Sequence, residues 1–313
     1  MASYAQVFLF CSQVVALSRG ERGVDLHSLY NTVAQFFPDY WLGTLASAAF
    51  GAFAGAWINN RIQTKKAIIE ELNVVRAALV LCLSVSNRFI SLKRQHVRPM
   101  RDRYVQARQE HDEFKERVWT HRGPPPLVHD FHADLQTITP VIVPIQVLER
   151  YVFEKNFRSR RALAAAVDLV GAIVGLDKSI KYRNDLIAEV HKESPVQANL
   201  LMERYFGLRN ANGVTDERFK AGVEAIYNQT DDCIFFSRIL ADDLLTYGNG
   251  LRRKNAWKYR LGTPKLKGAD WSPAERQGLL PGNEAYASWL GGFPAQPTRW
   301  QRFVARTRGA TAG

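Results

Sequence analysis

The sequence predicts an all-α protein in which one N-terminal transmembrane helix continues into a long-helix cytoplasmic bundle, followed by an irregular basic tail. Three observations predict this fold class. Residues 40–60 form an uncharged run of spanning length. Apolar residues recur at helical spacing through much of the chain after it. The alternating pattern of β-strands is minimal throughout. The predicted divisions are an extracytoplasmic segment over residues 1–39, a transmembrane helix over 40–60, a cytoplasmic bundle over 61–258 and a basic tail containing Pro, Gly and Trp over 259–313.

The charge balance favours partners that carry negative charge. The 313-residue chain has 42 Lys and Arg against 30 Asp and Glu, a formal net charge of +12. This suits phospholipid head groups and nucleic acid alike, and it does not choose between them. Its three cysteines, Cys11, Cys82 and Cys233, are far apart and form no CxxC pair. Their number and spacing are typical of a reducing compartment rather than of a disulfide framework.

The run from Tyr40 to Asn60 is the predicted membrane helix. It contains no charged residue, and at about 1.5 Å per residue it can cross the ~30 Å of hydrocarbon in a bilayer. Tyr40, Trp41 and Trp57 lie near its ends, where amphipathic rings favour the membrane–water interface. The alternative is an alanine-rich helix buried inside a soluble protein.

Small residues recur at every fourth position of this run: Gly43, Ser47, Gly51 and Gly55. Four-residue spacing keeps them on one face of a helix, where a second helix can approach closely. In a soluble helix the same glycines would lower helix propensity without an evident gain. The pattern therefore predicts self-association through this face, that is, a homo-oligomer in the bilayer.

The charges that flank the run predict its orientation. Residues 25–39 contain no Lys or Arg, whereas Arg61, Lys65 and Lys66 follow the run closely. Because basic residues favour the cytoplasmic side, the N-terminus is expected outside and the large C-terminal part in the cytoplasm of a single-pass inner-membrane protein. A weaker alternative pairs Tyr4–Leu17 with the span as a second helix, although that segment is shorter than a usual span.

The rest of the chain reads as a series of long helices. Residues 60–97 contain no glycine or proline, and a charged helix is expected to extend past Pro99. Around Pro140 the chain is expected to be extended, and a turn is expected near Gly213. The predicted helices cover residues 60–97, 100–122, 160–192, 196–208 and 216–248, and another begins at Pro144.

Two groups of residues could carry chemistry, although no Walker, GxGxxG, HExxH or GxSxG motif is present and neither a cofactor nor a metal is predicted. Asp231 and Asp242 share one helix face, as do Asp232 and Asp243. These carboxylates could hold Mg²⁺ for a phosphohydrolase or nucleotide-processing reaction. The more common alternative is an ion-pair network with Arg238 and basic neighbours.

The second group lies in HDFHAD, where His129 and His132 are joined by Asp130 and Asp134. An HxxH pair without a third ligand in reach is a poor metal signature. A solvated or locally hydrogen-bonded helix start is the expected structure.

A basic and aromatic stretch, RRKNAWKYRLGTPKLK, covers residues 252–267 and contains no acid. It suits anionic lipid head groups at about 1 kcal/mol per basic residue near the surface. It also suits nucleic-acid phosphates with base stacking, and a solvated tail is the third alternative. The candidate contacts are Arg252, Arg253, Lys254, Trp257, Lys258, Tyr259, Arg260, Lys265 and Lys267.

Three segments, DDCIFFSRILADDL (231–244), SLKRQHVRP (91–99) and PIQVLERYVFEK (144–155), resemble segments of a family of uncharacterised bacterial membrane-anchored helical proteins. The resemblance runs from about Trp41 to Trp289. It implies a bacterial origin, the architecture above and a setting among mobile or defence-associated genes. The family has no assigned activity, so no site is carried over.

The function expected first is therefore non-enzymatic. The chain is expected to self-associate in the inner membrane and to act as a scaffold that docks a cytoplasmic protein partner, or as a membrane-perturbing effector in stress or phage defence. The alternatives are a membrane-tethered Mg²⁺-dependent enzyme that uses the aspartates near residue 240 and a membrane-tethered nucleic-acid binder that uses residues 252–267.

Overall fold

The computed structural model describes residues 39–124, 129, 131–154, 159–193, 198–210, 212–259, 262 and 264–293, with side-chain surroundings given from residue 48 onward. Every regular element in this part of the chain is helical, so the all-α prediction is confirmed. The helices are α3 (Asp39–Leu92), the π-helix η1 (Lys93–Val97), α4 (Arg98–Thr120), α5 (Ile145–Glu154), α6 (Arg160–Lys192), α7 (Ala198–Phe206), α8 (Arg218–Ala256), α9 (Ser272–Arg276), the 3₁₀-helix η2 (Asn283–Tyr286) and α10 (Ala287–Gly291).

The chain divides into two compact units between Ile68 and Ile69. The described part of the first unit is the beginning of α3, residues 39–68. The second unit starts on the same helix and contains all the remaining elements.

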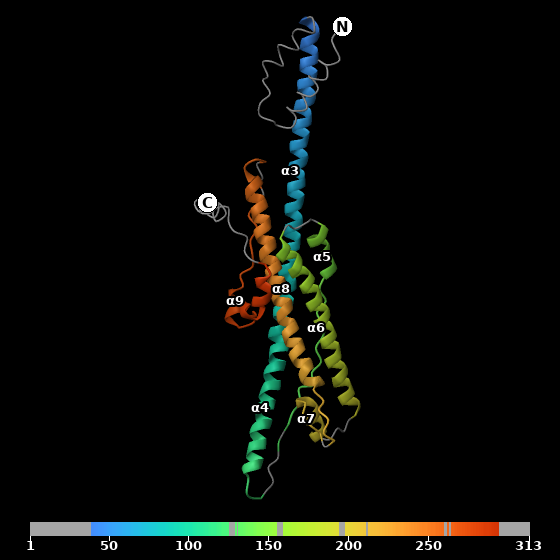
Figure 1. The fold of residues 1–313 in the computed structure, drawn as a ribbon, viewed down its shortest axis with the longest axis vertical. Helices are drawn as coiled ribbons and strands as arrows, with labels where there is room; N and C mark the ends of the chain where they lie inside the picture. Colours follow the sequence, from blue (N-terminus) through green and yellow to red (C-terminus); the bar gives the residue numbers. More distant parts are fainter. Residues whose placement is uncertain are drawn as a thin grey trace, which may run out of the picture. The chain divides into compact units, whose positions relative to one another are not determined.

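In the second unit, α8 is the central helix. It contacts α6, α7, α4 and η1, and α6 lies alongside it (Figure 1). Apolar residues at helical spacing, including Ile226, Ile234 and Leu240, are fully buried on α8. Where α8 meets α3, Ser86 Oγ donates a hydrogen bond of 2.8 Å to Ser237 Oγ, which in turn donates to Ile234 O at 3.1 Å, so both buried hydroxyls have partners.

Pro99 explains the change of helix type between α3 and α4. A proline inside an α-helix has no N–H to donate, and its ring crowds the carbonyl four residues earlier, here that of Gln95. The turn directly before Pro99 is a π-helix, in which Arg98 N–H donates to the carbonyl of Lys93, five residues back. The predicted passage of the helix past Pro99 is confirmed, and the wider turn is what permits it.

An extended segment, residues 131–143, lies between α4 and α5, and among the described residues it makes no backbone–backbone hydrogen bond to another segment. Side chains of α6 hold it instead. The Asn184 amide donates to Ile138 O at 2.8 Å and accepts from Ile138 N–H at 3.1 Å. Arg183, which is buried, donates to Gln136 O at 2.6 Å and to Asp134 O at 3.1 Å. The expected extended region and the helix that begins after Pro144 are both confirmed.

Residues 264–293 are packed onto α8 and include α9, η2 and α10, so this part of the predicted irregular tail contains short helices. The Tyr286 ring stacks on Phe235, with 3.7 Å between ring centroids and 6° between ring planes. Trp289 Nε1 donates to Asp168 Oδ2 on α6 at 2.6 Å. Partial burial of these two large aromatic rings against the core stabilises the packing of this Pro- and Gly-containing segment. The tail beyond residue 293 lies outside the described residues.

Candidate functional site

The start of α3 carries large apolar side chains that are exposed. Phe50 is 79% exposed, Phe53 54% and Trp57 57%. Ile58 and Ile62 are about half exposed, so the apolar surface continues for several turns. Contiguous apolar surface of this kind marks a membrane or protein contact.

The predicted packing face falls on the same helix. At Gly51 and Gly55 an added Cβ atom would meet no atom within 4 Å, so the surface beside both glycines is open. Gly43 and Ser47, like the predicted interface anchors Tyr40 and Trp41, belong to α3, but the structure does not describe their exposure or contacts. Among the described residues, none of the helices combines the length and the apolar character needed to cross a membrane.

The carboxylates near residue 240 have separate partners, and among the described residues they do not converge as the alternative Mg²⁺ site would require. Asp231 is ion-paired with Lys93 of η1. Asp232 accepts a hydrogen bond of 2.8 Å from Tyr286 Oη. Desolvation on burial raises the pKa of both carboxyl groups, and the Lys93 ammonium opposes this shift at Asp231.

The other two aspartates also lie apart. Asp243 is buried and receives Arg161 Nε at 3.0 Å and Ser159 Oγ at 3.3 Å, which ties the start of α6 to α8. Asp242 is exposed. Arg238 donates to Asn283 Oδ1 at 2.9 Å, so the bases of the two ion pairs are Lys93 and Arg161 rather than Arg238. The ion-pair interpretation of this cluster thus agrees with the structure, with a corrected set of bases.

His129 belongs to an aromatic cluster rather than to a helix start. Its ring stacks on Phe114 at 4.8 Å and lies 5.7 Å from His111. Burial lowers the pKa of His111, whose ring also stacks on Phe206 at 5.3 Å. Among the described residues no three His, Cys, Asp or Glu side chains converge as metal ligands. Asp130 lies outside the described residues.

The predicted basic contacts cluster around the end of α8. Trp257 is 94% exposed, and the Lys258 ammonium lies 5.3 Å from the Tyr259 ring centroid. Arg253 and Lys254 are exposed on the last turn of the helix. Lys265 and Lys267 are also exposed, Arg252 is partly buried and Arg260 lies outside the described residues.

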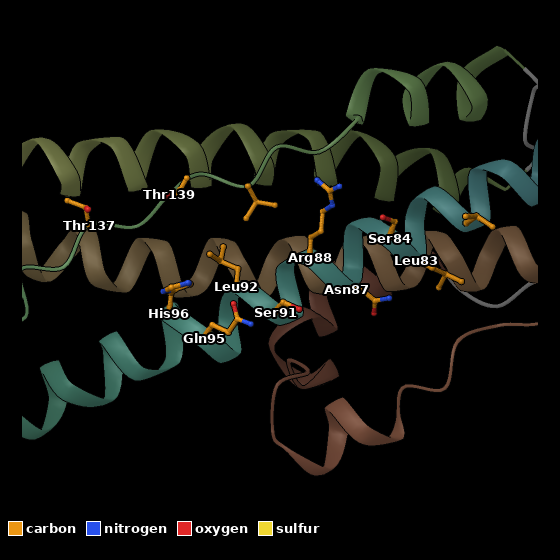
Figure 2. A pocket seen from close by; sticks show the side chains of 12 residues that line it. Leu83, Ser84, Asn87, Arg88, Ser91, Leu92, Gln95, His96, Thr137 and Thr139 are labelled. Atoms are coloured by element: carbon orange, nitrogen blue, oxygen red, sulfur yellow. The ribbon is translucent and has the colours of Figure 1, made fainter.

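A groove of about 810 Å³ lies between α3 with η1 on one side and the extended segment 131–143 on the other (Figure 2). Arg88 reaches across it from α3 and donates to Ile142 O on the extended segment. Gln95 and His96 of η1 lie at the same end of the groove as Thr137, and Leu83 lies toward the other end (Figure 2). The lining residues are Val80, Leu83, Ser84, Asn87, Arg88, Ser91, Leu92, Gln95, His96, Thr137, Thr139 and Val141.

The π-helix determines which side chains face this groove and which face α8. At about 100° per residue, a regular α-helix would place His96 roughly 160° around the axis from Val80. The wider turn of η1 rotates it back toward the lining face of α3, and His96 lines the groove. Lys93, on the same turn, does not line the groove; it is only 2% exposed and pairs with Asp231 of α8.

No protein-family model, curated protein or solved structure matches this chain. The groove was not predicted from the sequence, because helix α4 stands between its two walls in the chain and the extended segment has no helical periodicity. One sequence signal was present: Pro99 within a helical run announces a distortion in the turn before it, and π-turns occur frequently at functional sites.

Proposed function

We propose that the chain is a bacterial inner-membrane protein that is anchored by the first part of α3 and self-associates through the face of Gly43, Ser47, Gly51 and Gly55. The observation that carries the proposal is the exposed apolar surface from Phe50 to Ile62. Full transfer of these large side chains from water to hydrocarbon is worth about 1.5–3 kcal/mol each. Leaving them in water therefore forfeits on the order of 5–10 kcal/mol, which insertion into a bilayer would recover.

The end of the apolar surface supports the proposed orientation. The Arg61 guanidinium lies over the Trp57 ring, 5.5 Å from the centroid. A tryptophan followed one turn later by a base suits an interface, because the ring occupies the head-group level while the cation reaches toward phosphate. Basic residues on this side of the span favour the cytoplasm for everything that follows.

Self-association is supported by the open surface beside Gly51 and Gly55, where a second helix can approach the backbone. The test replaces both with leucine, Gly51→Leu and Gly55→Leu, in the full chain in membranes. The matched control is Ala49→Leu with Ala56→Leu, which adds leucine bulk on a face more than about 90° away. Crosslinking and native electrophoresis should show smaller assemblies for the glycine variant alone. Equal assembly size in the two variants would remove the packing claim.

The scaffold and effector roles differ in what assembly does to the bilayer. An effector of stress or phage defence would depolarise the inner membrane when it assembles, and the glycine variant would not. A scaffold would leave the membrane potential unchanged in both cases. A potential-sensitive dye in cells that express the two variants at equal levels distinguishes the roles.

We further propose that the end of α8 contacts anionic lipid, supported by the exposed Trp257 beside Arg253 and Lys254. Retention of the full chain on phosphatidylglycerol vesicles should fall with rising salt and should fall in Arg253→Gln with Lys254→Gln. The control Lys181→Gln with Lys192→Gln removes the same charge from exposed sites on α6. Preference for single-stranded nucleic acid over the vesicles at matched charge would favour the nucleic-acid alternative instead.

A further inference from the structure

We propose that the groove between α3 and the extended segment binds a small molecule that carries a phosphate group. Its volume of about 810 Å³ falls within the range of small-molecule sites, which is about 300–1,000 Å³. The site is independent of the membrane anchor, since all of its lining residues belong to the unit that begins at Ile69.

The charge of the lining points to an anion. Arg88 and His96 can both carry positive charge, and the described residues that line the groove include no Asp or Glu. One guanidinium N–H of Arg88 donates to Ile142 O, and the planar guanidinium has further N–H groups to offer a ligand. Arg is the side chain best suited to phosphate because its donors match two oxygens at once.

Neutral donors surround Arg88 and His96, and they can contact a phosphate ester as well. Ser84, Ser91, Thr137 and Thr139 contribute hydroxyl groups, and Asn87 and Gln95 contribute amides. A phosphate oxygen accepts hydrogen bonds from all of these groups, and several neutral donors together orient an anion without adding net charge. Hydroxyls and amides would equally contact the polar part of the ester beyond its phosphate.

The dimensions of the groove limit the ligand further. Eight residues separate Arg88 from His96, which corresponds to about 12 Å along the helix axis. The Arg88 side chain is directed to Ile142 O and lies apart from His96 along the groove (Figure 2), so a ligand that contacts both extends along the groove. The buried Leu92 and the partly buried Val141 provide apolar contact for its uncharged part. A nucleotide, or the glycerophosphate head of an anionic lipid, has this combination of groups.

The test is calorimetric titration of the full chain in phosphatidylcholine nanodiscs with inorganic phosphate, AMP and ATP. A parallel arm replaces the lipid with phosphatidylglycerol and asks whether it competes with ATP. Binding of AMP or ATP would indicate that the ligand is a soluble phosphate ester. Phosphatidylglycerol that occupies the groove without ATP, detected as lipid co-purified from mixed nanodiscs, would indicate that the ligand is a lipid head group. The variants are Arg88→Gln and His96→Gln, and each should weaken binding at least tenfold.

The control is Arg94→Gln, an exposed base on the same π-turn that does not line the groove, and it should stay within twofold of the natural chain. Arg88→Gln also removes the contact with Ile142 O, so its effect on binding could come from a change in the groove itself. His96→Gln tests ligand binding without removing that contact. Absence of binding by all of these phosphate compounds would overturn the proposal. So would equal binding by the natural chain and both groove variants, or a loss in Arg94→Gln as large as the loss in His96→Gln.

Discussion

Replacing Asp231 with leucine is expected to destabilise the helical bundle strongly, because it leaves the Lys93 ammonium buried without its counter-charge. Lys93 is 2% exposed, and its ammonium lies 4.9 Å from the Tyr227 ring, which cannot replace a carboxylate. Removing one partner of a buried ion pair costs about 3–5 kcal/mol. For a folded unit of this size that corresponds to a fall in Tm on the order of 10 °C.

The reverse replacement, Lys93→Met, should cost less. Asp231 is 16% exposed and has a second cation, Arg101, within electrostatic reach. Burial already raises the pKa of the Asp231 carboxyl, so this group can take up a proton when its counter-charge is removed. The double variant, with Met and Leu in contact, should recover most of the stability lost in Asp231→Leu.

Thermal unfolding of the full chain in detergent, followed by circular dichroism, gives the four Tm values of this cycle. Tm shifts of less than about 2 °C in both Asp231→Leu and Lys93→Met would contradict a stabilising ion pair. So would a Tm shift in the double variant equal to the sum of the two single shifts, because the coupling between the two residues would then be absent.

Three further predictions test other contacts. Burial raises the pKa of Asp232 on folding, so its ionised form lowers the stability of the folded state at neutral pH. Asp232→Asn, which still accepts from Tyr286 Oη, should therefore raise Tm at pH 7. This gain should be lost below the ordinary pKa of 3.8, where the carboxyl is protonated in both the folded and the unfolded state. Gly248→Ala should lower the free energy of unfolding by about 1–3 kcal/mol, because its Cβ would lie 2.4 Å from Leu266 Cδ1. Gly250→Ala, whose Cβ would have no atom within 4 Å, should raise the free energy of unfolding by up to about 1 kcal/mol in the same denaturation assay. Tyr286→Ala should speed tryptic cleavage at the exposed Arg276 at least tenfold, because the Tyr286 ring stacked on Phe235 holds residues 264–293 in place. The control is Tyr182→Ala at an exposed position, and equal cleavage rates in the two variants would contradict this expectation.

Helical periodicity predicted the elements better than their limits. The expected helix at residues 160–192 has those bounds in the structure, because its apolar stripe is continuous and Ser159 caps its first turn by accepting from Ala162 N–H. The last long helix was expected to end at residue 248, yet α8 continues to Ala256. Gly248 does not end the helix; it allows Leu266 and Val75 to approach the helix backbone.

The contacts that build the candidate sites could not be predicted, because they join residues that are distant in the sequence. Lys93 and Asp231 are 138 residues apart, and the local sequence around either residue does not predict that the two form an ion pair. The sequence placed four aspartates on shared faces of a single helix, but their partners come from η1, from the start of α6 and from the packed segment near Tyr286. Helix geometry alone could therefore place these aspartates on the faces of one helix, but it could not show which residues pair with them.

Membrane anchoring by the first part of α3 is tested most directly by alkaline carbonate extraction of cell membranes. The full chain should remain in the pellet. Ala49→Arg with Phe53→Arg should release it, since each arginine in the middle of a span costs about 2.5–3.5 kcal/mol. The control Val105→Arg with Val118→Arg, at exposed apolar positions on α4, should stay in the pellet. Extraction of the natural chain into the soluble fraction, or retention of the Ala49→Arg/Phe53→Arg variant, would contradict the anchor.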